Sequence, residues 1–174
     1  TFIVGDSTDG SALFTTACVY GGPGAMLDDC GNVNAGITGG AISAGASYDF
    51  GNGFTVATGM QTTQQVLTEE SKDSLAFNAA YTGDNYGVSI TYATGENATL
   101  TDDDKATAFN GYYTPEGGLP SISVGYEIGD RGGLASNIDG FESFFAGLTW
   151  DEVGPGSLGV ALGHSTTLEG NDEE

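Results

Sequence analysis

The chain has 174 residues, of which 24 are acidic and only 3 are basic, so its formal net charge is -21. A chain this acidic cannot neutralise phosphate groups, which argues against nucleic acid as a partner. No run of about eighteen apolar residues occurs, so no transmembrane helix is predicted. The length suits one domain. High charge and abundant glycine also occur in disordered chains, but a regular alternation of apolar side chains through eight segments argues against disorder.

Residues 1–39 are predicted to form a surface loop region that contains a disulfide. Cys18 and Cys30 stand in the stretch CVYGGPGAMLDDC, which is rich in Gly, Pro and Asp. An even number of cysteines in a chain that we expect to be exported favours a disulfide, worth about 3 kcal/mol in the chain-entropy model. Two free thiols in a reducing compartment are the alternative.

Residues 40–166 are predicted to form four β-hairpins, followed by an acidic loop at 167–174. Apolar side chains alternate with small or polar ones in most of the eight segments. Three aromatic residues depart from this parity: Tyr112, Phe141 and Phe145. Tight turns near Asn52, Asp84, Gly117 and Val153 alternate with longer acidic loops at 62–73, 96–104 and 130–137.

Aromatic residues flank the tight turns, and all of them lie on the apolar parity. Such amphipathic rings are favoured at a membrane–water interface, so we expect an aromatic girdle there. The opposite parity is small and polar, and strands of about ten residues can cross the hydrocarbon of a membrane when tilted. The sequence therefore predicts an all-β fold, an antiparallel up-and-down transmembrane β-barrel. The residues of the predicted girdle are Phe50, Phe54, Tyr81, Tyr86, Tyr113 and Trp150.

The predicted inward parity is too small to fill a closed barrel of eight strands. An open sheet edge cannot stay in lipid, because its backbone groups would lack partners. We therefore expect about eight strands of a larger barrel in residues 1–174, with the remaining strands outside this sequence.

Charges that line a constriction set the selectivity of a pore. None of the predicted inward-facing residues is basic, and Lys72, Lys105 and Arg131 all fall on the side of the long loops. This pattern predicts a mild preference for cations, with Glu127 as the strongest single candidate. A solvated carboxylate near the outer rim is the alternative for Glu127. The predicted pore-facing residues are Asp49, Gln61, Asn78, Asn110 and Glu127.

The sequence predicts no enzyme, no cofactor and no metal site. His164 lies on the apolar parity, and no Ser or Cys is placed to act with it as a nucleophile. The acidic clusters lack the spacing of a calcium loop and are expected to be solvated, with weak divalent-cation binding that bridges loops or lipopolysaccharide as the alternative. These clusters are Asp6 with Asp9, and residues 69–70, 102–104 and 171–174.

Two hairpins carry a resemblance to a known family. Residues 146–163, AGLTWDEVGPGSLGVALG, resemble a strand–turn–strand near the end of the barrel in cyanobacterial outer-membrane porins. This group is related to the OprB-type carbohydrate-selective porins and is often called the iron-uptake porins. Residues 44–54, AGASYDFGNGF, are similar to the hairpins of the same family, and the resemblance extends from about residue 39 to residue 166.

The resemblance implies passive diffusion of small hydrophilic solutes and ions through a water-filled channel in the outer membrane. Partners would be outer-membrane lipid, lipopolysaccharide, solutes and cations, and a homotrimer is compatible with this interpretation. Members usually carry an N-terminal surface-layer-homology domain and a coiled segment, and neither occurs in this sequence. The alternative is a soluble β-rich surface-layer or adhesive protein with acidic loops, which would dissolve without detergent.

Overall fold

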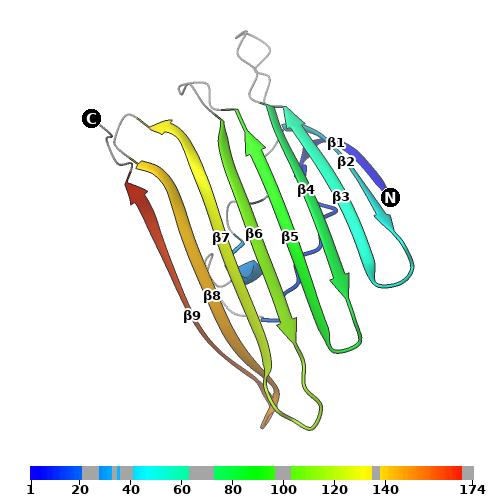
Figure 1. Ribbon diagram of the computed structural model, residues 1–174. Helices are drawn as coiled ribbons and strands as arrows, with labels where there is room; N and C mark the ends of the chain where they lie inside the picture. Colours follow the sequence, from blue (N-terminus) through cyan, green and yellow to red (C-terminus); the bar gives the residue numbers. More distant parts are fainter. Residues whose placement is uncertain are drawn as a thin grey trace.

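The computed structural model describes residues 1–20, 28–32, 35, 41–62, 73–96, 103–134 and 138–169. Nine antiparallel strands form one sheet, and each strand pairs with its neighbours in the sequence (Figure 1). Within the described residues β1 and β9 do not pair with each other, so the sheet is open. The strands are β1 (Phe2–Thr8), β2 (Ala41–Asp49), β3 (Phe54–Thr62), β4 (Asp73–Thr82), β5 (Tyr86–Gly95), β6 (Asp104–Tyr113), β7 (Ser121–Leu134), β8 (Ile138–Val153) and β9 (Gly156–Glu169).

Helical structure in the described ranges is limited to one short 3₁₀ helix, η1 (Asp28–Gly31). No helix among these residues is long and apolar enough to cross a membrane.

The all-β, antiparallel, up-and-down arrangement is confirmed, and so are the four predicted hairpins, β2–β3, β4–β5, β6–β7 and β8–β9. The prediction that residues 1–39 form a loop region is wrong for Phe2–Thr8, which pair with β2 and raise the number of strands to nine. Phe2 and Val4 continue the outward apolar parity, opposite Ala46 and Ala44. Ile3 lies between them and obscures the alternation.

Two predicted loops are shorter than expected. β7 runs to Leu134 and β8 begins at Ile138, so strand structure occupies most of the predicted loop 130–137. β9 continues to Glu169, beyond the predicted start of an acidic loop at residue 167. In both places pairing with β8 gives polar backbone groups a partner, which turn composition alone does not reveal. The other predicted long loops fall largely outside the described residues.

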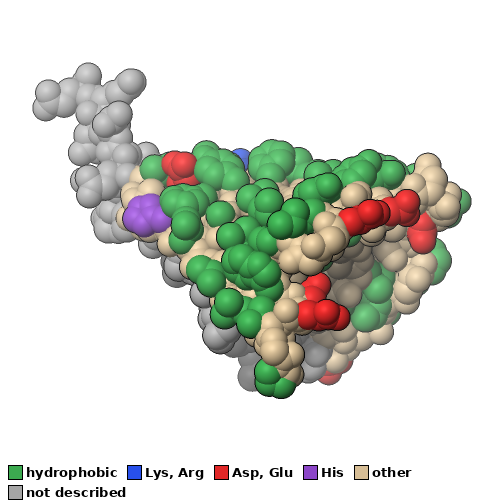
Figure 2. Space-filling model, turned by 90° about the horizontal axis from the view of Figure 1, so that it is seen from below, with side chains coloured by type: hydrophobic (Ala, Val, Ile, Leu, Met, Phe, Trp, Pro, Cys, Tyr) green, Lys and Arg blue, Asp and Glu red, His purple; other side chains and the backbone are tan. Residues whose placement is uncertain are grey.

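The two faces of the sheet differ sharply in composition and exposure. In β5 the exposed fractions of Val88 and Ile90 are 53% and 41%, whereas those of Ser89 and Thr91 are 6% and 1%. The same alternation continues in the neighbouring strands, which places the apolar side chains on the exposed face. Seen from the end that carries the tight turns, hydrophobic side chains cover this outer face (Figure 2). A water-soluble sheet normally has the opposite arrangement.

The inner, polar face is covered by the chain's own N-terminal part. We call the described residues 9–20, 28–32 and 35 the inner strap. The strap follows β1 and lies behind the sheet in the view of Figure 1, and η1 contacts β7 and β8. Its polar contacts reach from β3 to β7. The sheet and the strap thus form two layers.

Small apolar clusters lie between the strap and the sheet. Phe145, 2% exposed, packs edge-on against Tyr20 of the strap, with ring centroids 5.3 Å apart. Phe141 packs with Ala35 of the strap and with Ala106 and Ala108 of β6. Phe141 and Phe145 depart from the apolar parity because they face the strap rather than the outer face. A third cluster joins Ala76, Ala93 and Phe14.

The predicted disulfide between Cys18 and Cys30 is confirmed, with the two Cα atoms 5.9 Å apart. Its expected position on a surface loop is wrong, because Cys30 is fully buried against the inner face. The disulfide joins the first part of the strap to η1.

The turn between β2 and β3 allows a stability test with a matched control. Gly51 and Gly53 both have a positive φ, 75° and 85°. A Cβ at Gly53 would overlap the Thr82 carbonyl, whereas a Cβ at Gly51 would meet nothing within 4 Å. We expect Gly53→Ala to lower the free energy of unfolding by about 1–3 kcal/mol more than Gly51→Ala. Thermal unfolding followed by circular dichroism measures this difference, and equal melting temperatures would contradict it.

Candidate functional site

A row of polar side chains crosses the inner face, with members on five adjacent strands, β3 to β7. Each is at most 6% exposed. They are buried because the main chain of the inner strap lies over them. The row consists of Gln61, Asn78, Ser89, Thr91, Asn110, Ser123 and Glu127.

On β3, β4 and β5 these side chains bind the first part of the strap. The Gly10 amide donates to Gln61 Oε1 at 3.2 Å, and the Ala17 amide donates to Ser89 Oγ at 2.9 Å. Asn78 makes two bonds to Thr15: its Oδ1 accepts from the Thr15 amide and its Nδ2 donates to the Thr15 carbonyl, both at 3.0 Å. The Asn78 side chain therefore accepts one hydrogen bond from the Thr15 backbone and donates one to it, as a residue of a neighbouring strand would.

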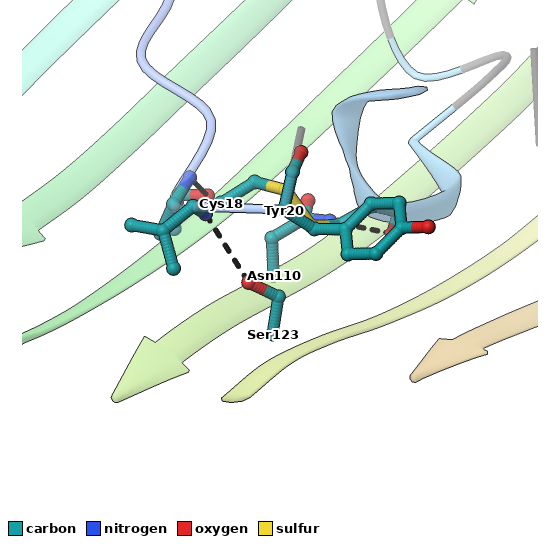
Figure 3. Close-up of a disulfide and its surroundings, with 8 residues drawn as sticks. Cys18, Tyr20, Asn110 and Ser123 are labelled. Carbon is teal, nitrogen blue, oxygen red and sulfur yellow. Dashed lines mark hydrogen bonds between the residues drawn. A yellow bond between two sulfur atoms is a disulfide. The ribbon is translucent and has the colours of Figure 1, made fainter. Parts of the chain in front are cut away.

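On β6 and β7 the row binds both parts of the strap that the disulfide joins. Asn110 and Ser123 point toward the strap beside the disulfide (Figure 3). Asn110 Nδ2 donates to the Cys30 carbonyl at 3.0 Å, and Ser123 Oγ accepts from the Val19 amide at 3.2 Å. Glu127 Oε1 accepts from the Ala35 amide at 2.6 Å. Backbone N–H and C=O groups that are removed from water need such partners. The hydrogen bonds from the row therefore offset the free-energy cost of burying the strap's backbone.

Glycines on the inner face leave room for the strap. A Cβ at Gly59 of β3 would overlap the Gly10 carbonyl, and a Cβ at Gly125 of β7 would overlap the Cys30 carbonyl. These positions need glycine because another backbone approaches them closely. The small residues of the inner face therefore provide space for the backbone of the strap.

The predicted pore-facing residues occupy two different environments. Gln61, Asn78, Asn110 and Glu127 are on the inner face as predicted, but all are buried under the strap. Asp49 is exposed at the end of β2, beside a tight turn. Glu127 is fully buried, so the alternative given for it, a solvated carboxylate at the outer rim, is wrong.

Sequence reasoning missed the inner strap. Phe141 and Phe145 lie on the polar parity, and this was the signal that could have revealed the strap. Two phenylalanine side chains are unfavourable on a face that contacts only water, so they indicate that something covers that face. Asn78 and Asn110 were a second signal, since carboxamides in the middle of strands often satisfy a buried backbone.

The aromatic residues beside the tight turns lie where the alternation placed them, on the outer face. Two pairs contact each other across a turn: Phe50 and Phe54, with ring centroids 5.4 Å apart, and Tyr81 and Tyr86, 5.6 Å apart. His164 is exposed on β9, with its ring centroid 6.1 Å from that of Phe144. That these rings lie at a membrane–water interface stays a prediction.

Some of the carboxylates lie at the end of the sheet that carries the tight turns (Figure 2). The described basic residues, Lys105 and Arg131, lie toward the opposite end, where Arg131 is 5.2 Å from the centroid of the Phe141 ring. No group of three potential metal ligands occurs among the described residues, which include Asp6, Asp9 and residues 103–104 but not 69–70, 102 or 171–174. The exposed carboxylates at the turns, here called the acidic rim, are Asp49, Asp84, Glu116, Asp151 and Glu152.

Replacement of Asn78 tests whether the polar row holds the strap. Asn78→Ala removes both bonds to Thr15, at a cost of about 1–3 kcal/mol. We expect the backbone amides around Thr15 to exchange with deuterium about 5- to 150-fold faster. Asn85→Ala, in a tight turn, is the control and should leave this exchange unchanged. Unchanged protection of Thr15 in Asn78→Ala, measured by mass spectrometry, would contradict the assigned role.

No family model, no curated protein and no solved structure matches the chain.

Proposed function

We propose that the chain forms part of the wall of a water-filled channel in an outer membrane, through which small hydrophilic solutes and ions diffuse. One observation carries this proposal: the face that is exposed is apolar, and the face that is buried is polar. Full burial of a Val or Ile side chain is worth about 1.5–3 kcal/mol, so a row of exposed ones strongly favours apolar surroundings. Lipid supplies such surroundings along the whole outer face.

The dimensions of the sheet support the same proposal. β4, β5 and β6 have ten residues each, the length that a tilted strand needs to cross the hydrocarbon. Exposed aromatic side chains border the apolar band at the tight turns, among them Phe50, Tyr86 and Tyr113. Rings at this position suit the level of the lipid headgroups at one face of the membrane.

The free edges of β1 and β9 require partners in a membrane. Unpaired backbone groups cost several kcal/mol each in hydrocarbon, so only a closed barrel is stable there. The proposal therefore includes further strands that pair with these edges and complete a wider barrel. The resemblance of residues 44–54 and 146–163 to outer-membrane porin hairpins agrees with such a barrel.

A mild preference for cations follows from the acidic rim. Its carboxylates are exposed at one end of the sheet, and the sequences of the tight turns contain no Lys or Arg. A mouth of one charge sign raises the local concentration of oppositely charged ions, and salt screens this effect.

Planar-bilayer recording of the intact protein, purified in detergent, tests this function. We expect stepwise conductance and, under a salt gradient, a reversal potential on the cation side. The double variant Asp151→Asn/Glu152→Gln should lower the permeability ratio of cations to anions by up to about twofold. Asp103→Asn/Asp104→Asn removes the same charge at the other end and serves as the control, with a smaller effect expected.

A well-folded protein that dissolves without detergent and gives no conductance would contradict the channel. That result would favour a soluble surface-layer or adhesive protein. Conductance with a preference for anions would contradict only the proposed selectivity.

A further inference from the structure

We propose that the inner strap is a fixed constriction of the channel, and that it, rather than the side chains of the wall, sets the width available to solutes. This inference rests on the proposed function. The inner face of the sheet is the channel side of the wall, so anything held against it takes up cross-section. The polar row and the disulfide hold the strap there.

The strap is anchored at many separate points. Gly10 is bonded to β3, Thr15 to β4 and Ala17 to β5. Val19 and Ala35 are both bonded to β7. A segment held at one end can swing away from a wall, but one hydrogen-bonded to five strands, β3 to β7, must break several contacts together. The strap is therefore a permanent part of the channel wall.

Packing under the strap supports the same conclusion. The Tyr20, Cys30 and Phe145 side chains form one buried cluster, and Phe14 packs on Ala76 and Ala93 in another. Removal of the strap would expose these apolar groups on the channel side. Gly59 and Gly125 let its backbone lie directly on the sheet.

The disulfide fixes the strap where it passes β6 and β7. Cys18 precedes Val19, which is bonded to Ser123, and Cys30 is bonded to Asn110. The cross-link thus ties two anchored parts of the strap together above neighbouring strands. Without the disulfide, Val19 and Cys30 would be held to the sheet only by these hydrogen bonds and by packing.

The strap also changes which side chains a solute meets. Asn78, Asn110 and Glu127 lie under it, where they position the strap instead of contacting ions. A solute would first meet the residues of the strap that are exposed. They are Asp9, Ala12, Thr15 and Val19.

A pair of glycine variants on adjacent strands tests the constriction in the intact protein. Gly125→Ala places a Cβ where the Cys30 carbonyl lies, whereas a Cβ at Gly111 makes only ordinary contacts, the nearest at 3.5 Å. We expect Gly125→Ala to raise single-channel conductance by about 1.5- to 2-fold and to admit larger neutral polymers. Gly111→Ala should behave as the unmodified protein. Faster deuterium exchange at Val19 and Ala35 should accompany the change only in Gly125→Ala.

Reduction of the disulfide in the folded, unmodified protein gives a second test that does not depend on the folding of a variant. A thiol reductant added during recording should raise conductance in the same direction. Unchanged or lower conductance after the strap amides lose protection would overturn the constriction and leave the channel intact. Amides that stay protected in Gly125→Ala would contradict the close packing on which the inference depends. If the unmodified protein does not conduct at all, the channel itself fails and the constriction with it.

Discussion

The arrangement of this protein depends on one constraint: backbone N–H and C=O groups removed from water must find partners. Within the sheet each strand satisfies its neighbours. The described residues of the inner strap pair with no strand, and side chains such as Asn78 and Glu127 supply their partners instead. The polar residues of the inner face are therefore explained by the strap that lies on them.

The same constraint connects the two faces with the proposed location. A sheet that uses its polar side chains to hold a strap has only its apolar face left to meet the surroundings. Val88 and Ile90 on that face are exposed, and contact of such apolar side chains with water is unfavourable in free energy. Contact with lipid would remove this cost. In the proposed channel, polar groups and strap face inward and apolar groups face lipid, which reverses the usual order of a soluble domain.

Strands β2 to β9 were predictable because alternation over about ten residues is a local signal, and the tight turns with Gly51, Gly53 and Gly117 mark the ends of several of them. The strap was not predictable in the same way. It has no periodicity, and its contacts join residues 51 to 104 positions apart, as in Gly10 with Gln61 and Val19 with Ser123. Asn78 and Glu127 could be placed on the inner face by parity, but parity says nothing about what covers them. Cys18 and Cys30 could be paired because they are the chain's two cysteines.

The most direct test of the central claim, that the outer face contacts lipid, is nitroxide accessibility in reconstituted vesicles. Labels at Val160 and Leu162 report the outer face of β9, and labels at Gly163 and Ser165 report its inner face, where both residues are exposed. We expect the outer labels to collide mainly with oxygen dissolved in the bilayer, and the inner labels with a water-soluble nickel complex. Equal access of the nickel complex to all four positions would show that both faces meet water, and would contradict the account.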